Sequence, residues 1–260
     1  MRGRALVTGA GKRIGRALAL YLAGRGWDVA VHYATARAEA EATVAELRAQ
    51  GAAACALQAD LLEEAAAQAL VPRAAAELGG PLSLLVNNAS IFEHDDLASM
   101  TRTSWDRHIE SNLRAPVVLA QAFAAQAPGA SEDAAGEPRA GAQIVNIIDQ
   151  RVRKLTPEFM SYTIAKSGLW TFTQTAAQAL APGIRVNAIG PGPTVQGVRQ
   201  SPEHFARQRA ATPLGRGAGP QDIAAALGYL MDAPAVTGQL ICVDGGQHLA
   251  WQTPDVLGVE

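Results

Sequence analysis

The chain has 260 residues, of which 18% are charged, a net charge of −2 and a pI of about 6.2. This balance excludes a general basic surface for nucleic acid, and no apolar stretch approaches the roughly 20 residues that span a bilayer. Residues 1–8 contain two arginines and no apolar signal core, and the two cysteines lie in apolar segments, as reduced thiols do. We therefore expect one domain over residues 1–260, located in the cytoplasm.

Segments with strand and helix patterns alternate along the chain. Apolar runs predict strands at residues 5–8, 28–33, 53–58, 82–86, 143–148, 185–189 and 239–243. Helical spacing predicts helices at residues 14–25, 38–50, 63–78, 105–126, 162–180 and 221–231. Pro72 is expected to kink or split the third of these helices. Strands that alternate with helices form βαβ units, so we predict an α/β fold: a doubly wound, seven-stranded parallel sheet with helices on both faces.

Two connections are longer than the others. Residues 128–141 are small, polar and rich in turn formers, which predicts a surface loop. Residues 190–220 contain five prolines and follow the sixth strand. Loops beyond the carboxyl ends of parallel strands bind ligands, so we interpret residues 190–220 as a substrate flap.

The first strand runs into a glycine-rich turn, TGAGKRIG, at residues 8–15. Gly9 permits a tight turn, and Gly11 allows a backbone conformation that other residues do not adopt. Gly15 lets the next helix pack close to the sheet. The free N–H groups and positive dipole end of that helix favour a pyrophosphate. The pattern is typical of a Rossmann dinucleotide site, although a purely structural strand–turn–helix junction is the alternative. Arg13 stands where such turns often carry another glycine.

The second strand bears on the choice of cofactor. A carboxylate for a free ribose 2′-hydroxyl is expected about 20 residues beyond the glycines, yet residues 29–37 contain no Asp or Glu. They offer His32, Thr35 and Arg37 instead. A cationic pocket favours a 2′-phosphate, and Arg13 can reach around the turn toward it. We therefore predict NADPH/NADP+ as the cofactor, with Arg13 and His32 at the phosphate; a half-buried strand-end histidine is the alternative for His32.

Tyr162 and Lys166 are four residues apart in SYTIAK, so they project from one face of the predicted helix. A nearby ammonium lowers the pKa of a tyrosine and makes the phenol a better proton donor near neutral pH. On its own, this pair also fits an exposed helical face.

The context of this pair resembles the short-chain dehydrogenase/reductase family over nearly the whole chain. The matching motifs are TGxxxxxG at residues 8–15, AD at 59–60, NNAS at 87–90, Asn112, the Tyr162–Lys166 pair, RVNAIGPGPT at 185–194 and GQLICVDGG at 238–246. The resemblance implies that Tyr162 supplies a proton and that Lys166 holds the nicotinamide ribose and tunes Tyr162. It also implies that Asn112 orders a water that relays protons toward Lys166.

One position departs from the common family pattern. Asp149 lies thirteen residues before Tyr162, where the family usually has Ser. Together with Arg13, and with Phe92 shortly after NNAS, this resembles the pteridine reductase branch, including dihydrofolate- and dihydromonapterin-type reductases, in which a Phe stacks on the pterin. A protonated Asp149 can donate to a ring nitrogen, which suits reduction of a C=N bond. The alternatives are an Asp149 that only caps the strand end and a Phe92 that only fills the core.

The expected contacts follow from these motifs and from the resemblance. Expected cofactor contacts are Gly9, Gly11, Arg13, Ile14, Gly15, His32, Tyr33, Asp60, Leu61, Asn88, Ala89, Ser90, Tyr162, Lys166, Pro191, Gly192 and Thr194. Expected substrate contacts are Ser90, Phe92, Asp149 and Tyr162, and the catalytic set is Asn112, Asp149, Tyr162 and Lys166. No metal site is expected, because the five histidines are scattered and EHDD at residues 93–96 fits a solvated loop.

The sequence therefore predicts an NADPH-dependent reductase acting on a small pterin or dihydrofolate-like molecule. The alternatives are a carbonyl reductase of the 3-oxoacyl or sugar/alcohol type, and a cofactor-binding regulator without turnover. The resemblance also implies a homotetramer in which helices 105–126 and 162–180 pair across two-fold axes. Small and apolar residues of the second helix would allow close approach: Ala165, Leu169, Phe172, Ala176 and Ala177.

Overall fold

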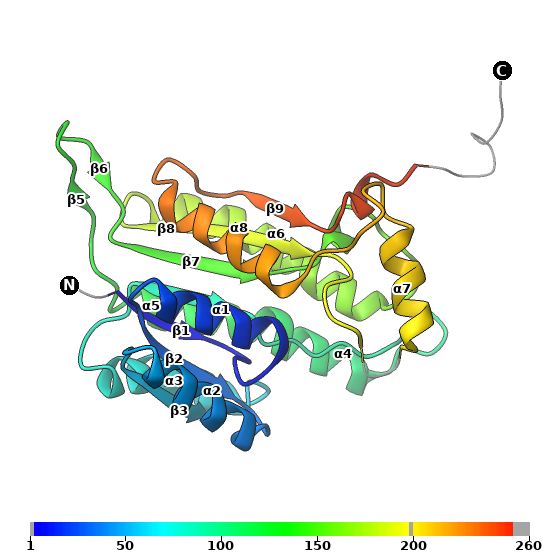
Figure 1. Ribbon diagram of the computed structural model, residues 1–260, viewed down its shortest axis with the longest axis horizontal. Helices are drawn as coiled ribbons and strands as arrows, with labels where there is room; N and C mark the ends of the chain where they lie inside the picture. The colour runs from blue at the N-terminus through cyan, green and yellow to red at the C-terminus, as the bar shows by residue number, and fades with distance from the viewer. Residues whose placement is uncertain (1–2, 198–199, 252–260) are drawn as a thin grey trace.

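The core of the protein is a sheet of seven parallel strands in the order β3-β2-β1-β4-β7-β8-β9 (Figure 1). The computed structural model describes residues 3–197 and 200–251. The strands are β1 (Arg4–Val7), β2 (Asp28–Tyr33), β3 (Ala54–Gln58), β4 (Leu84–Asn87), β7 (Ala142–Ile147), β8 (Ile184–Pro191) and β9 (Leu240–Val243). Each overlaps a predicted apolar run, as expected for parallel strands covered on both faces. The predicted fold class is confirmed.

Helices cover both faces of this sheet (Figure 1). One layer contains α1 (Arg13–Gly24), α2 (Arg37–Ala49) and α8 (Pro220–Asp232). The other contains α3 (Glu64–Glu77), α5 (Ala115–Ala124) and α6 (Met160–Leu180). Leu22 and Leu47 belong to the core under the first layer, whereas Leu70 and Phe123 belong to the core under the second. Two apolar cores on opposite faces of one sheet define a doubly wound fold.

Two of the helices differ from the sequence-based expectations. Pro72 lies inside a continuous α3, because its neighbours Leu70 and Val71 are buried in the core and packing offsets the lost hydrogen bond. The single helix predicted at 105–126 is α4 (Arg102–Ile109), a π-helical turn (Glu110–Arg114) and α5.

Both long connections contain structure that the sequence did not predict. The 128–141 loop carries a short exposed hairpin, β5 (Ser131–Glu132) with β6 (Pro138–Arg139). The 190–220 flap carries α7 (Pro202–Ala210), whose first turn is capped by the Ser201 hydroxyl; residues 198–199 of the flap lie outside the described residues. Figure 1 places α7 at the carboxyl ends of β8 and β9, far from the hairpin.

The strand order indicates where on the sheet a ligand is expected to bind. Going along the chain, the sheet grows from β1 to β2 and β3 on one side, and from β4 outward on the other. β1 and β4 are therefore neighbours at the point where the order reverses, and the segments that follow them meet at the carboxyl edge. In doubly wound sheets this edge is where ligands bind.

Further expectations concern the two cysteines, the outward face of α6 and membrane-spanning helices. Cys55 and Cys242 are free thiols, as predicted. Ala165, Leu169, Ala176 and Ala177 are buried inside the chain's own core, so they do not form the outward face of α6. Every helix within the described part of the chain is too short or too polar to cross a membrane.

Candidate active site

The glycine turn leaves the start of α1 open. Gly9 has a φ of +63°, and a side chain at Gly15 would overlap the Gly9 carbonyl oxygen. Lys12, the residue that precedes α1, gives the helix no side-chain cap, and no acidic residue lies in the first turn. The first N–H groups of a helix have no acceptor within it, so those of Arg13, Ile14 and Gly15 are available to an anion.

The His32 side chain stabilises this turn through hydrogen bonds. Its Nδ1 accepts a 3.1 Å hydrogen bond from the Gly9 N–H, and its Nε2 lies 3.1 Å from the Ala59 carbonyl oxygen, to which it donates. Burial lowers the pKa of His32 to about 4, so the ring is neutral at neutral pH. The expectation that His32 binds the 2′-phosphate is therefore corrected: a buried, neutral ring with both nitrogens engaged shapes the turn instead.

Arg13 lies in the turn, and Arg37 follows the end of β2. Arg13 has a φ of +57°, and its guanidinium donates to the carbonyl oxygens of Gln196 (2.8 Å) and Val195 (3.1 Å). It thereby links the glycine turn to the segment after β8. Arg37 begins α2 and donates a 3.2 Å hydrogen bond to the Tyr33 hydroxyl at the end of β2. Arg37, rather than His32, is the exposed cation at the strand end where a ribose is expected.

The end of β4 is tied to the end of β1. The Thr8 hydroxyl accepts hydrogen bonds of 2.9 Å from the N–H groups of both Asn88 and Ala89. The Asn88 amide donates back to the carbonyls of Thr8 (2.8 Å) and Gly9 (3.2 Å). The expected cofactor residues Asn88 and Ala89 therefore lie against the glycine turn.

The remaining expected cofactor residues lie after β3 and β8. Asp60 is exposed and accepts a hydrogen bond from the Leu62 N–H, whereas Leu61 is buried. Pro191 ends β8; the Gly192 N–H donates 3.1 Å to the Val243 carbonyl, and the Thr194 hydroxyl donates 3.0 Å to the Gly192 carbonyl. A side chain at Gly192 would collide with Asp244, which is why glycine is required there.

Asp149, Tyr162 and Lys166 come together at the carboxyl edge of β7. The Tyr162 hydroxyl donates a 2.9 Å hydrogen bond to Asp149 Oδ2, and Asp149 Oδ1 accepts from the Arg151 N–H at 2.8 Å. Lys166 Nζ donates to the Ile147 carbonyl at 2.8 Å and lies 5.8 Å from the centre of the Tyr162 ring. The structure thus joins the two acids that the sequence placed thirteen residues apart.

Burial dominates the acid–base properties of this trio. It raises the pKa of Asp149, and burial together with the Asp149 carboxylate raises the pKa of Tyr162 well above its usual value. Burial lowers the pKa of Lys166 to about 8. Two neighbouring acids whose ionisation is opposed by burial titrate as a coupled pair.

Asn112 holds the loop after β4. Its side-chain amide is fully buried, accepts from the Ile91 N–H at 2.8 Å and donates to the Ile91 carbonyl at 2.7 Å. It projects from the π-helical turn, a distortion frequent at functional sites. The loop carries Ser90, whose hydroxyl lowers the pKa of Tyr162 through a hydrogen bond, and Phe92. The water relay through Asn112 stays a prediction.

Phe92 belongs to a stack of flat groups beside the acid pair. Its ring is 46% exposed, stacks on Phe159 with centroids 4.3 Å apart and meets the Tyr162 ring edge-on at 4.7 Å. The Arg151 guanidinium lies 5.2 Å from the centre of the Phe159 ring, and its Nε is buried without a partner among the described residues. Phe159 and Arg151 were not among the residues predicted for the site. Both lie in the segment between Asp149 and Tyr162, and this position could have pointed to them.

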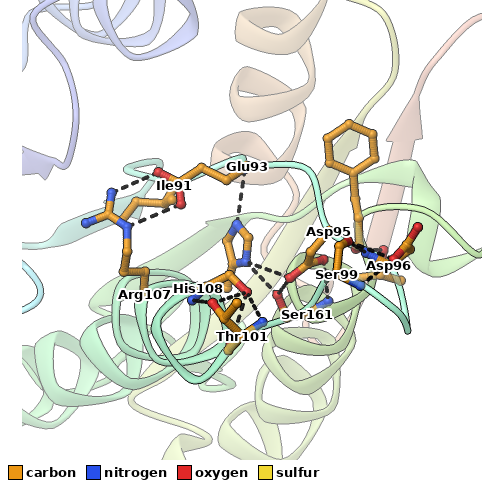
Figure 2. Close-up of polar contacts among 12 residues, drawn as sticks. Ile91, Glu93, Asp95, Asp96, Ser99, Thr101, Arg107, His108 and Ser161 are labelled. Carbon is orange, nitrogen blue, oxygen red and sulfur yellow. Dashed lines mark hydrogen bonds and ion pairs between the residues drawn. The ribbon is translucent and has the colours of Figure 1, made fainter.

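The EHDD segment also differs from its interpretation as a solvated loop. Glu93 pairs with Arg107, Nη2 to Oε1 at 2.9 Å, and Asp96 caps a short turn at Ser99. Asp95, however, is buried and accepts hydrogen bonds from Ser161 (Figure 2). Among the residues that the structure describes, no group of three or more His, Cys, Asp or Glu side chains is arranged to hold a metal ion.

The chain is similar to known proteins over nearly its whole length. Residues 9–248 match the family model described as enoyl-(acyl carrier protein) reductase. A solved structure of FolM alternative dihydrofolate reductase 1 from Brucella suis, in complex with NADP, is 44% identical with a TM-score of 0.90, over 98% of each chain. The Brucella canis protein of the same name, also with NADP, is 42% identical with a TM-score of 0.89, over 98% of each chain.

A relative with another activity is also similar. The 3-oxoacyl-[acyl-carrier-protein] reductase FabG of Staphylococcus aureus is 34% identical over 254 residues, which are 96% of this chain and 99% of the relative. Because the family model covers residues 9–248 and FabG is 34% identical over nearly the whole chain, the chain belongs to the short-chain dehydrogenase/reductase family of oxidoreductases.

Proposed function

We propose that the protein is an NADPH-dependent reductase of a C=N bond in a pterin or dihydrofolate-like substrate. The observation that carries this proposal is the hydrogen bond from Tyr162 to Asp149, in a site where burial raises the pKa of both acids. A carboxyl group whose pKa is raised by burial keeps its proton to a higher pH and can donate it to a ring nitrogen, whereas the hydroxyl of a serine is too weak an acid.

The residues present fit a dinucleotide. The uncapped, non-acidic start of α1 offers N–H groups to a pyrophosphate, and Asn88 and Ala89 line the same turn. Lys166 has one proton committed to Ile147, which leaves two for a ribose. Arg37 at the end of β2, with no carboxylate in residues 29–37, favours the 2′-phosphate of NADPH. The NADP in the two Brucella structures supports this cofactor.

The protein's own residues deliver the proton. NADPH, when bound, supplies a hydride, and therefore both electrons, to the carbon of the C=N bond. The nitrogen gains its proton from the Asp149–Tyr162 pair, so the substrate gains C–H and N–H bonds and the pair is left with one proton fewer. Lys166 stabilises that negative charge, and solvent then returns the proton. Holding these groups in place is the protein's share of the catalysis.

The proposed substrate class rests on the aromatic ring of Phe92 as well as on the acidity of the Asp149–Tyr162 pair. Phe92 presents a partly exposed ring beside Tyr162, and a flat heterocycle can stack on it as Phe159 does here. The names of the two Brucella relatives support a dihydrofolate-like substrate. The similarity to FabG supports the main alternative, reduction of a 3-oxoacyl thioester by Tyr162 and Lys166.

One panel of assays tests the proposal. The purified protein is given NADPH with dihydrobiopterin, dihydrofolate or an acetoacetyl thioester in turn, and loss of NADPH absorbance is followed. We expect oxidation with a dihydropterin or dihydrofolate. Oxidation with the thioester alone would make the protein a carbonyl reductase. NADPH binding without oxidation in any arm would favour a regulator.

We further propose that the protein works in the cytoplasm as a homotetramer. Ile164 of α6 is exposed, so an apolar side chain is available there to pack against a second helix. Light scattering at micromolar concentration should give about four times the mass of one chain; the mass of a monomer would contradict the assembly.

A further inference from the structure

Asp95, His108 and Ser161 form a buried chain of hydrogen bonds that the proposed reaction does not use (Figure 2). Their exposed fractions are 1%, 0% and 0%. They come from three different segments: the loop after β4, helix α4, and the first turn of α6. The last of these is the turn that carries Tyr162.

The direction of the chain is defined by its ends. The Glu93 N–H donates to His108 Nε2 at 3.1 Å, so Nε2 is the unprotonated nitrogen. His108 Nδ1 therefore carries the hydrogen and donates to the Ser161 hydroxyl at 2.7 Å. The Ser161 hydroxyl in turn donates to Asp95 Oδ2. The hydrogen bonds of all three side chains can thus form together in one direction only, so the chain fixes the relative positions of these side chains.

Asp95 also caps α6 from a distant part of the sequence. Phe159, the residue before α6, has a left-handed backbone and provides no side-chain cap. Asp95 replaces that cap: Oδ1 accepts from the Ser161 N–H at 3.1 Å, and its carbonyl accepts from the Met160 N–H at 3.2 Å. A carboxylate at a helix N-terminus is favoured by the helix dipole.

The protonation states agree with this arrangement. Burial acts to raise the pKa of Asp95, but hydrogen bonds from Ser161, with smaller contributions from Ser104 and His108, outweigh it and leave the pKa below its usual value. Burial lowers the pKa of His108. At neutral pH the chain thus joins a neutral imidazole, a hydroxyl and a carboxylate.

The three residue types are those of a hydrolytic triad, but the geometry excludes that role. A nucleophilic serine must be exposed to substrate and give its proton to the histidine. Ser161 is fully buried and instead accepts a hydrogen bond from His108. The chain has no reacting atom within reach of solvent, so its effect must pass through its neighbours.

Those neighbours are the two sides of the substrate site. Tyr162 follows Ser161 directly, and the His108 ring meets the Tyr162 ring edge-on at 6.0 Å. Phe92 precedes Glu93, the residue whose N–H His108 holds, and its ring lies 4.7 Å from that of Tyr162. We propose that Asp95, Ser161 and His108 are positioning residues that fix Tyr162 relative to Phe92. They set the distance between the proton donor and the surface on which a flat substrate stacks.

Replacing Ser161 with Ala tests this role, because it removes the hydroxyl that links His108 to Asp95 and keeps the N–H group that Asp95 accepts from. The matched control is Ser99→Ala, which also removes a hydroxyl-to-carboxylate hydrogen bond, to Asp96 at 2.7 Å, in the same loop without touching α6. We expect Ser161→Ala to lower kcat roughly 10- to 100-fold and to raise the substrate KM, since a misplacement of about 1 Å can cost about 100-fold. The Kd for NADPH should change less than about twofold, and Ser99→Ala should match the wild type.

A second measurement does not depend on turnover. Hydrogen exchange in the cofactor-free protein should be faster in Ser161→Ala for the amides of Glu93 and Ser161, and unchanged there in Ser99→Ala. The kinetic arm assumes the proposed function, in which Tyr162 donates the proton, and it uses whichever panel substrate the wild type reduces. Faster exchange in a protein that reduces no dihydropterin would reject the pterin proposal and keep the positioning role. A folded Ser161→Ala variant with wild-type exchange, kcat and KM, whatever its Tm, would overturn the positioning role.

Discussion

The Tyr162 hydroxyl donates a 2.9 Å hydrogen bond to the Asp149 carboxylate, so two acids rather than one meet at the proposed proton-donating position. The serine usual at this position of the family can orient a carbonyl oxygen but is too weak an acid to give up its proton near neutral pH. We propose that this difference favours reduction of C=N over C=O bonds, and one substitution tests it.

Asp149→Ser should lower kcat on a dihydropterin by roughly 100- to 10,000-fold, the usual scale for loss of general acid catalysis. The Kd for NADPH should change little, because Asp149 lies against Tyr162 and the Arg151 backbone rather than against the glycine turn. Carbonyl reduction, if present, should survive or improve. Steady-state kinetics on both substrate classes provides the measurement. Equal activity of wild type and variant on oxoacyl thioesters, with none on dihydropterins, would reject the pterin assignment.

The Arg151 guanidinium should set the alkaline limit of activity. Its positive charge lowers the pKa of both Asp149 and Tyr162, opposing the larger effect of burial. Removing it with Arg151→Met should raise both pKa values. Activity that needs the protonated pair is lost as the pH rises through its apparent pKa, so this limb of the kcat profile should move to higher pH.

Arg153→Met is the matched control for the Arg151 variant, since the Arg153 side chain lies over the Trp170 ring. Its profile should match that of the wild type. If the alkaline limb stays in place in Arg151→Met, Lys166, whose pKa burial lowers to about 8, is the group that sets it.

Two arginines near the glycine turn should separate the contributions to cofactor binding. Arg37 is exposed at the end of β2, so Arg37→Ala should weaken NADPH by roughly 10- to 100-fold, the scale of one charge-assisted contact, and leave NADH unchanged. Arg13 holds the carbonyls of Val195 and Gln196, so Arg13→Ala should weaken both cofactors alike. Fluorescence titration with NADPH and NADH measures both. An NADPH-selective loss in Arg13→Ala would instead place Arg13 at the 2′-phosphate.

His32 should make folding stability depend on pH. Burial lowers its pKa from 6.5 to about 4. Between these values the unfolded chain binds more protons than the folded one, so the stability of the fold rises with pH through this window. His32→Gln keeps one acceptor and one donor but does not titrate, and it should reduce the rise by up to roughly 3 kcal/mol, since one pKa unit corresponds to about 1.4 kcal/mol.

Urea unfolding of the wild type and His32→Gln between pH 4 and 7 measures this contribution. His204→Gln removes an exposed histidine of α7 and should leave the pH dependence as in the wild type. A His32→Gln curve parallel to that of the wild type would mean that His32 titrates in the folded protein much as in the unfolded chain.

Local sequence pattern was enough to predict the strands and the shared helix face of Tyr162 and Lys166. The seven apolar runs became seven strands because each buries itself between two helical layers, whatever the details of its neighbours. Tyr162 and Lys166 share a face because helical spacing puts residues four apart together. The same reasoning missed α7 and the β5–β6 hairpin, which are short and exposed, so no periodic apolar face marks them.

The roles of individual polar residues were decided by the tertiary structure. The sequence showed a histidine at the end of β2, but only the packing of β2 beneath the glycine turn engages both nitrogens of His32, with Gly9 and Ala59. It showed acidic residues at 93–96, but only the docking of the loop on α6, 66 residues further along the chain, buries Asp95 as a helix cap. A hydrogen bond depends on positions in space, and strand order brings these groups together, whereas the spacing of residues along the chain records only the contacts within one helix or strand.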